Sequence, residues 1–207
     1  IASRGKLPIV AGGTGFYIDA LFGKIDTLSI PRNKTLRSKL EKLNVREFQK
    51  ELKKLSPDRF YRMNNSDVNN KRRLIRAIEV VQAKGRIINT DKPIFALHEV
   101  LIIGLKTSMG NLKKRIVARV KRRIKMGAIL EAEKLFKNYN KLSPQLKTAS
   151  GYKKLFDYLA GKINLEEAKE RWILSDYQYA KRQMTWFKRN KNILWFDIGQ
   201  PGFEGKI

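Results

Sequence analysis

A glycine-rich turn near the start of the chain is the first segment whose residues could do chemistry. An apolar run over residues 7–11 leads into Gly12, Gly13, Thr14 and Gly15. Glycines let a ligand approach the backbone closely, and the Thr14 hydroxyl adds a hydrogen-bond donor. Because ligands bind at the carboxyl ends of strands in α/β sheets, we expect a strand over residues 7–11 and a ligand cradle at the turn. An ordinary glycine turn is the alternative. The turn is not a Walker loop, because the chain contains no GKS or GKT sequence.

Arginines recur at helical spacing in two segments of the chain. They are Arg72, Arg73 and Arg76 in the first, and Arg115, Arg119, Arg122 and Arg123 in the second. Residues three or four apart share one face of a helix, so each set can present its guanidinium groups together. Guanidinium donors match phosphate oxygens, and we therefore predict an anion between the two sets. Two solvated amphipathic helices are the alternative.

Aromatic and basic residues alternate towards the end of the chain. They are Tyr177, Tyr179, Lys181, Arg182, Trp186 and Phe187. RNA bases stack on surfaces of this kind, which favours a role in nucleic-acid binding. The alternative is that the aromatic side chains are core anchors, and we favour that interpretation for Trp186. His98, the one histidine, has no partner in the sequence pattern and is interpreted as structural.

The composition points to a polyanionic partner. The 207 residues include 45 Lys and Arg against 19 Asp and Glu, which gives a formal net charge of +26. Nucleic acid is the first interpretation, an anionic membrane surface the second, and a Lys-rich proteome the alternative that needs no partner. The absence of cysteine and the single histidine exclude disulfides, thiolate sites and a His-based zinc site.

The same composition indicates where the protein acts. No apolar run reaches the roughly 20 residues of a membrane span, no signal peptide is visible, and we expect a cytoplasmic protein with no membrane partner. The chain begins at Ile1 and enters an apolar segment almost at once, so we expect it to start inside a larger protein.

Hydrophobic periodicity predicts an α/β fold in which helices are the majority. Strands are expected over 7–11, 100–105 and 193–196. Helices are expected over 16–22, over 35–55 with a break at Asn44, over 72–84 up to Gly85, over 112–125, over 131–139, from Asn164 onward, and over 177–188. We divide the chain into an α/β core, 1–24 with 66–207, and a small helical insertion, 25–65.

Several of these segments resemble motifs of the tRNA dimethylallyltransferases. Residues 12–17 look like the family's GGTGLY, 36–40 like LRxxL, 69–80 like NNxRRxxRALEV, 115–127 like RIxxRVxxMxxxG, 151–153 like the GYK of IGYKE, and 178–186 like QYAKRQxTW. Each motif is short, but together they occur in the family's order over nearly the whole chain.

The resemblance implies an enzyme that moves a dimethylallyl group from dimethylallyl diphosphate to N6 of the adenine 3′ of the anticodon. Its fold would be a P-loop-NTPase-like parallel-sheet core with a helical insertion that contacts the tRNA anticodon stem-loop and with extra C-terminal helices. The adenine would be flipped into the site, and Mg²⁺ with arginines would neutralise the departing diphosphate. We expect a monomer.

Roles follow by position from the resemblance. Catalytic roles are implied for Thr14 and Arg119. Substrate contacts are implied for Gly12, Gly13, Thr14, Arg76 and Arg119, where the arginines would bind the diphosphate or shape its channel. Contacts with tRNA are implied for Thr14, Arg37, Arg72, Arg73, Leu74, Ile75, Arg76, Lys147, Thr148, Ala149, Ser150, Gly151 and Tyr152. No residue of the chain is expected to ligate a metal.

Departures from the family pattern limit what this chain is expected to do. The family's GxTxxGKS loop and its general-base aspartate are absent from these residues, so we expect a fragment that binds tRNA and is inactive alone. Ser150 replaces the isoleucine of IGY, which we expect to loosen local packing, and Tyr177 stands where an arginine is common. The alternative functions are a non-catalytic basic RNA-binding protein and a P-loop nucleoside kinase.

Overall fold

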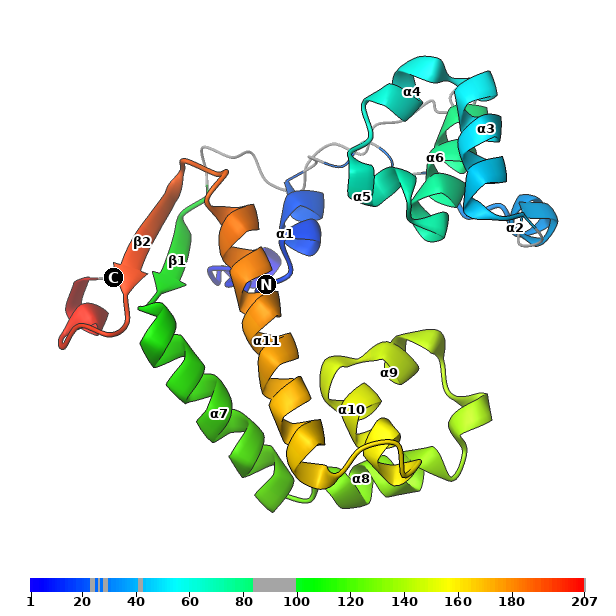
Figure 1. The fold of residues 1–207 in the computed structure, drawn as a ribbon. Helices are drawn as coiled ribbons and strands as arrows, with labels where there is room; N and C mark the ends of the chain where they lie inside the picture. Colours follow the sequence, from blue (N-terminus) through cyan, green and yellow to red (C-terminus); the bar gives the residue numbers. More distant parts are fainter. Residues whose placement is uncertain (23–24, 26, 28–29, 41–42, 84–99, 207) are drawn as a thin grey trace. The chain divides into compact units, whose positions relative to one another are not determined.

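Helices make up most of the residues that the structure describes, and two short strands form the sheet found among them (Figure 1). The computed structural model describes residues 1–206 apart from 23–24, 26, 28–29, 41–42 and 84–99. Its residues fall into two compact units, the first formed by Ile1–Gly15 with Val100–Ile207 and the second by Phe16–Glu99. The combination of a parallel sheet with many helices confirms the predicted α/β class.

The second unit is a set of short helices joined by capped turns. They are α1 (Gly15–Leu21), α2 (Lys34–Leu40), α3 (Val45–Leu55), α4 (Pro57–Tyr61), α5 (Asn65–Val68) and α6 (Lys71–Ala83). The predicted break at Asn44 is confirmed: its side chain accepts from the Glu47 N–H, and the Glu47 carboxylate accepts from the Asn44 N–H. Such a reciprocal pair satisfies two donors that a helix start leaves free. Ser56 caps α4 by accepting a hydrogen bond from the Arg59 N–H, and Pro57 is the first residue of the helix.

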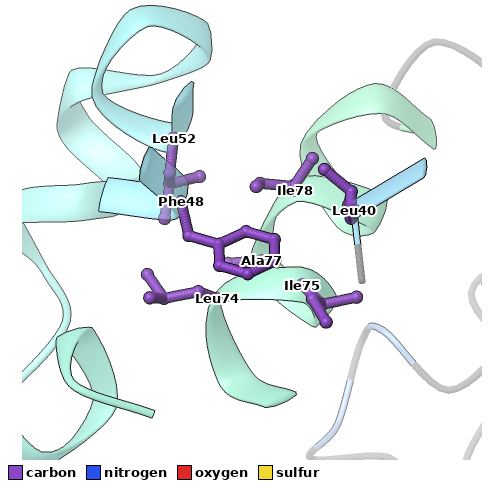
Figure 2. Packing of buried hydrophobic residues seen from close by; sticks show 7 residues of the cluster. All are labelled: Leu40, Phe48, Leu52, Leu74, Ile75, Ala77 and Ile78. Atoms are coloured by element: carbon purple, nitrogen blue, oxygen red, sulfur yellow. The ribbon is translucent and has the colours of Figure 1, made fainter. Parts of the chain in front are cut away.

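The core of the second unit lies between α3 and α6, with one residue from α2 (Figure 2). Its members are Leu40, Phe48, Leu52, Leu74, Ile75, Ala77 and Ile78. Phe48, Leu52 and Leu74 are completely buried. Each such side chain stabilises the fold by about 1.5–3 kcal/mol relative to exposure. This packing is what fixes α6, and therefore its arginines, against the helices before it.

The first unit contains the sheet and the longer helices. In chain order it has η1 (Ala2–Arg4), β1 (Ile102–Lys106), α7 (Met109–Lys125), α8 (Ala128–Phe136), η3 (Tyr139–Lys141), α9 (Pro144–Thr148), α10 (Ser150–Leu159), α11 (Leu165–Phe187), β2 (Ile193–Asp197) and η4 (Phe203–Lys206). The two strands are parallel, with Ile102 opposite Ile193. A side chain at Gly104 would lie 2.6 Å from both Ile193 and Trp195, so the strand needs glycine there. Both strands were predicted from the sequence.

The core of the first unit joins α7, α8, α10 and α11. Its buried members are Ile116, Val120, Ala132, Leu155, Phe156 and Trp172. Gly151 lies against Trp172, where an added Cβ would be 2.5 Å from the indole. This close approach explains why the start of α10 carries glycine.

Helix α11 is one continuous helix of 23 residues, although two separate helices were expected there. It begins where predicted, because the Asn164 side chain accepts from the Glu167 N–H.

Within the described part of the chain, no helix combines the length and apolar character that crossing a membrane requires.

The predicted strand over residues 7–11 is wrong. These residues have no regular secondary structure, and Leu7 and Ile9 are 83% and 82% exposed. A strand is stabilised by hydrogen bonds to a neighbouring strand. Among the described residues β1 and β2 pair with each other, and neither pairs with residues 7–11. The apolar pattern therefore predicted a burial that this part of the chain does not supply.

Some expectations concern residues that the structure does not describe. Gly85, expected to end α6, and His98 lie outside the described residues, as does Lys24 at the expected boundary of the insertion. Helix α6 packs against α3 inside the second unit. The division into a core of 1–24 with 66–207 and an insertion of 25–65 stays a prediction.

Candidate functional site

The glycine-rich turn is fastened to α11. The Gln183 side-chain amide donates to the carbonyl oxygen of Gly13 over 2.6 Å, and the Thr14 hydroxyl lies 3.1 Å from that of Tyr179. Tyr179 and Gln183 are four residues apart, so both project from one face of α11. Two consecutive residues of the turn are thus fixed by one helix that lies far from them in sequence.

Close approach explains one of the three glycines, Gly15, whereas the neighbour of Gly13 is the flexible end of the Gln183 side chain. A Cβ at Gly13 would collide with the Gln183 side chain, and one at Gly15 with the Trp186 indole. Nothing lies within 4 Å of a Cβ placed at Gly12. Thr14 itself is exposed. The backbone of the turn is therefore fixed by contacts with α11, while Thr14 stays accessible to solvent.

Arg119 forms an ion pair with Asp176. Its Nη2 lies 2.8 Å from Asp176 Oδ2, and the arginine side chain is 51% exposed against 14% for the aspartate. The other carboxylate oxygen, Oδ1, accepts from the Ser150 hydroxyl over 2.9 Å. Asp176 thereby links α7, α11 and the first residue of α10.

The remaining arginines of the α7 stripe are exposed. Arg115 and Arg122 are on the surface, and the Arg123 guanidinium carbon lies 5.9 Å from the centre of the Trp172 ring. No acidic residue occurs between Met109 and Lys125. The outer face of α7 is therefore strongly basic, as the sequence predicted.

Glu79 is a buried carboxylate that the sequence analysis did not identify. It is 3% exposed. Arg37 donates to both of its oxygens, over 2.6 and 2.8 Å, and the Asn33 N–H donates over 3.1 Å. Arg76 adds a bond of 3.1 Å. The hydrogen bond from Arg37 is the main reason that the pKa of Glu79 falls to about 2, against the opposing effect of burial.

Arg76 also binds two backbone carbonyl groups of the segment before α2. Its Nη2 donates to Thr27 O over 2.5 Å and to Ile30 O over 2.8 Å. Together with Glu79, it ties this segment to α6. The sequence signal was present but weak: Glu79 follows Arg76 by three residues and stands between apolar side chains.

The other predicted RNA-binding residues of α6 divide by exposure. Arg72 and Arg73 are exposed, and Arg73 forms an ion pair with Asp67. Leu74 and Ile75 are packed in the core and offer no side chain at the surface. A helix exposes only part of its circumference, so a motif along α6 contains both kinds of residue.

The segment 147–152 is held by local contacts. The Lys147 ammonium lies 3.3 Å from Asn140 O and 4.9 Å from the centre of the Tyr139 ring, and the Thr148 hydroxyl donates to Pro144 O over 2.8 Å. Ala149 is the residue before α10 and has no side-chain capping bond.

Ser150 and Tyr152 make further polar contacts in this segment. The Ser150 hydroxyl lies 3.0 Å from that of Ser175, besides its bond to Asp176, and the looser packing expected at this position stays a prediction. The Tyr152 hydroxyl donates to Glu131 over 2.6 Å, which raises the pKa of the tyrosine.

The aromatic residues of α11 lie partly at the surface. Arg182 lies 5.8 Å from the Tyr179 ring centre, and Arg189 lies 5.7 Å from that of Trp186. Trp186 is 39% exposed, so the interpretation of this residue as a core anchor is wrong. It packs against Gly15, where the missing side chain leaves room for the indole.

The described part of the chain contains no preformed cluster of metal-ligating side chains. There, no group of three or more His, Cys, Asp or Glu side chains comes together. Mg²⁺ prefers several oxygen ligands in near-octahedral geometry. We therefore derive no step through a metal ion.

Comparison with known proteins identifies the family. A family model described as IPP transferase matches residues 1–190. The chain belongs to the IPP transferase family. It is 33% identical to a tRNA dimethylallyltransferase of Halalkalibacterium halodurans over 100% of this chain and 67% of that protein. It is 36% identical to one of Ligilactobacillus salivarius over 96% of this chain and 66% of that protein.

Solved structures agree with the family assignment. A tRNA isopentenylpyrophosphate transferase of Bacillus halodurans has a TM-score of 0.60 at 32% identity, over 95% of this chain and 62% of that chain. A eukaryotic dimethylallyltransferase described as acting on tRNA has a TM-score of 0.73 at 28% identity, over 95% of this chain and 52% of that chain. This chain therefore spans about two thirds of the length of the curated relatives it matches.

Proposed function

We propose that this IPP transferase chain serves the transfer of a dimethylallyl group from dimethylallyl diphosphate to N6 of the adenine 3′ of the anticodon in tRNA. Family membership and the names of the relatives support the reaction class. The observation that carries the proposal is the attachment of Gly13 and Thr14 to α11. It joins two of the motifs on which the resemblance rested, although 165 residues separate Thr14 from Tyr179.

The reaction needs a nucleophile, a leaving group and a site that keeps them together. A bond forms between adenine N6 and the dimethylallyl carbon, the bond from that carbon to the diphosphate oxygen breaks, and N6 loses a proton. Thr14 lies at the reacting centre, and Arg119 neutralises the departing diphosphate. Preorganised donors of this kind lower the barrier because they are already aimed where charge develops. No described residue is assigned as the proton acceptor.

The tRNA is held chiefly by phosphate contacts. Arg72, Arg73 and the segment 147–152 supply exposed or half-buried groups, and the net charge of +26 supplies the attraction. Each phosphate contact adds to the salt dependence of binding. Leu74 and Ile75 are left out of these contacts because their side chains are buried. For Arg37 and Arg76 we propose an indirect role, because Glu79 and backbone carbonyls already bind two of the three side-chain nitrogens of each arginine.

The setting of the enzyme belongs to the same proposal. We propose a monomer acting in the cytoplasm on the anticodon stem-loop, with residues 25–65 as a helical insertion that contacts the RNA. The absence of cysteine agrees with a reducing compartment. Mg²⁺ stays implied by the resemblance alone.

The test is prenyl transfer by the protein at its full natural length, from radiolabelled dimethylallyl diphosphate to an anticodon stem-loop. We expect label in the RNA, and about 100-fold less with Arg119→Ala, the scale of losing one preorganised donor. Lys134→Ala, an exposed lysine of α8, is the matched loss of one positive charge and should keep the activity. Tight, salt-sensitive binding of the stem-loop without any label would favour the non-catalytic RNA-binding alternative.

A further inference from the structure

Asp176 uses both oxygens of its carboxylate to join three helices. Arg119 of α7 binds Oδ2 over 2.8 Å, and Ser150 of α10 binds Oδ1 over 2.9 Å. The aspartate side chain is 14% exposed, and the arginine side chain is 51% exposed. Asp176 is therefore fixed inside the first unit, and the Arg119 side chain that it binds reaches solvent.

Arg119 keeps most of its donors after this contact. Only Nη2 is engaged among the described residues, which leaves the other N–H groups of the fork for an anion. A phosphate group is bound best when two N–H groups of one guanidinium point at it together. A long side chain does not keep that aim unaided, because it has many rotamers.

The arginines of α7 repel one another, so a negative charge from another helix helps to hold Arg119 in place. Arg115 and Arg123 lie one helical turn on either side of Arg119, and like charges at this spacing repel. The helix has no acidic residue of its own between Met109 and Lys125. Asp176 supplies that charge from α11.

Ser150 fixes the orientation of the Asp176 carboxylate. Its hydroxyl has one hydrogen, which it donates to Asp176, so the Ser175 hydroxyl 3.0 Å away donates to Ser150 in turn. The resemblance puts isoleucine at position 150 in the family motif, and isoleucine cannot make this bond. The serine is thus a feature of this chain.

We infer that Asp176 is a positioning residue that aims Arg119 at a diphosphate group, and that Ser150 holds Asp176 in place. The identity of the diphosphate as the prenyl donor rests on the proposed function. The arrangement also connects the arginine to the first residue of α10, in the segment proposed to contact tRNA.

The experiment measures two quantities on the protein at its full natural length. One is the KM for dimethylallyl diphosphate in prenyl transfer, and the other is the dissociation constant for inorganic pyrophosphate by calorimetry. The variants are Asp176→Asn, Ser150→Ala, Arg119→Ala and the double variant Arg119→Ala with Asp176→Asn. Asp157→Asn is the matched control, because its carboxylate pairs with Lys153 on the surface of α10.

We expect Asp176→Asn to raise the KM and to weaken pyrophosphate binding by roughly 10-fold, and Ser150→Ala to do so by roughly 3-fold, in keeping with the loss of charged and neutral hydrogen bonds. Stem-loop affinity of Asp176→Asn should stay within about twofold of the unmodified protein. The double variant should match Arg119→Ala alone, because residues that act as a unit are not additive. Asp157→Asn should behave as the unmodified protein.

Additive losses in the double variant, unchanged pyrophosphate binding in Asp176→Asn, or no pyrophosphate binding by the unmodified protein would each overturn the inference. A protein that binds pyrophosphate through Arg119 and Asp176 but transfers no prenyl group would overturn the proposed function and leave the positioning role standing. Thermal unfolding of Asp176→Asn within a few degrees of the unmodified protein excludes misfolding as the cause.

Discussion

Two carboxylates bind arginines in the two units, and they do so in different ways. Glu79 is 3% exposed and accepts from Arg37, from Arg76 and from the backbone of Asn33. Asp176 accepts from one arginine, Arg119, which is half exposed. Arg76 and Arg119 are both arginines within rows of basic residues at helical spacing. Arg76 donates to Glu79 and to backbone carbonyls, whereas most N–H groups of Arg119 are available to a ligand. The partners of an arginine, more than its spacing, separate a structural role from a binding role.

The largest effect should come from Glu79→Gln. Removing the charge leaves Arg37 and Arg76 facing a neutral group, and breaking such a buried pair costs about 3–5 kcal/mol. Because these two arginine side chains are about a third exposed, water reduces the penalty, and we expect about 3 kcal/mol in the free energy of unfolding by urea. Glu51→Gln, a half-buried carboxylate of α3, is the control and should change it by less than about 0.5 kcal/mol. A loss of unfolding free energy for Glu79→Gln no larger than for Glu51→Gln would contradict the structural role of Glu79.

Acid should weaken the protein through the same residue. The pKa of Glu79 is about 2 in the folded state and 4.5 ordinarily, so its stabilising contribution is complete above about pH 4.5 and is lost as the pH falls towards 2. A shift of this size corresponds to at most about 3 kcal/mol. Urea unfolding at pH 5 and pH 3 should show a loss of about 2 kcal/mol in the unmodified protein and a clearly smaller loss in Glu79→Gln. Equal losses in the two proteins would assign the acid sensitivity to other groups.

Arg37→Lys should have an intermediate effect. Arg37 contacts both oxygens of Glu79 through a fork, which an ammonium group cannot reproduce. We expect about 1–2 kcal/mol less stability in urea unfolding, the cost of a weakened charged hydrogen bond. Lys39→Arg, on an exposed position of the same helix, is the reverse exchange and should be neutral. Full stability of Arg37→Lys would show that the fork geometry does not matter.

The smallest effect on stability should come from Asp176→Asn. Arg119 is half exposed, and ion pairs at the surface contribute about 0–1 kcal/mol. We therefore expect less than about 1 kcal/mol in urea unfolding, although pyrophosphate binding changes strongly. A loss as large as that of Glu79→Gln would place both carboxylates in the same structural class.

The sequence predicted features that depend on neighbours along the chain. Asn44 and Glu47 begin α3 by bonding each other, and Asn164 begins α11 in the same local way. The motifs that resemble the family are also short stretches of sequence, so they could be recognised without the structure. Residues 7–11 show the limit, because a strand depends on a partner strand that a local pattern does not reveal.

The resemblance named candidate site residues, but it did not reveal which side chains they contact. Thr14, Arg76 and Arg119 were named from the resemblance, but nothing in the letters pairs Thr14 with Tyr179, 165 residues away. Glu79 was missed because its partner Arg37 is 42 residues away, and a carboxylate in an apolar helix reveals its burial only when the fold is known. Long-range side-chain contacts of this kind depend on packing that the sequence specifies only as a whole.

The most direct test of the comparison is to measure pyrophosphate affinity and urea unfolding for Arg119→Ala and Arg76→Ala together. The account predicts that Arg119→Ala loses at least about 10-fold in affinity with stability changed by less than about 1 kcal/mol. It predicts that Arg76→Ala loses about 2 kcal/mol of stability with affinity changed by less than about threefold. The opposite pattern, with affinity lost in Arg76→Ala and kept in Arg119→Ala, would contradict the account.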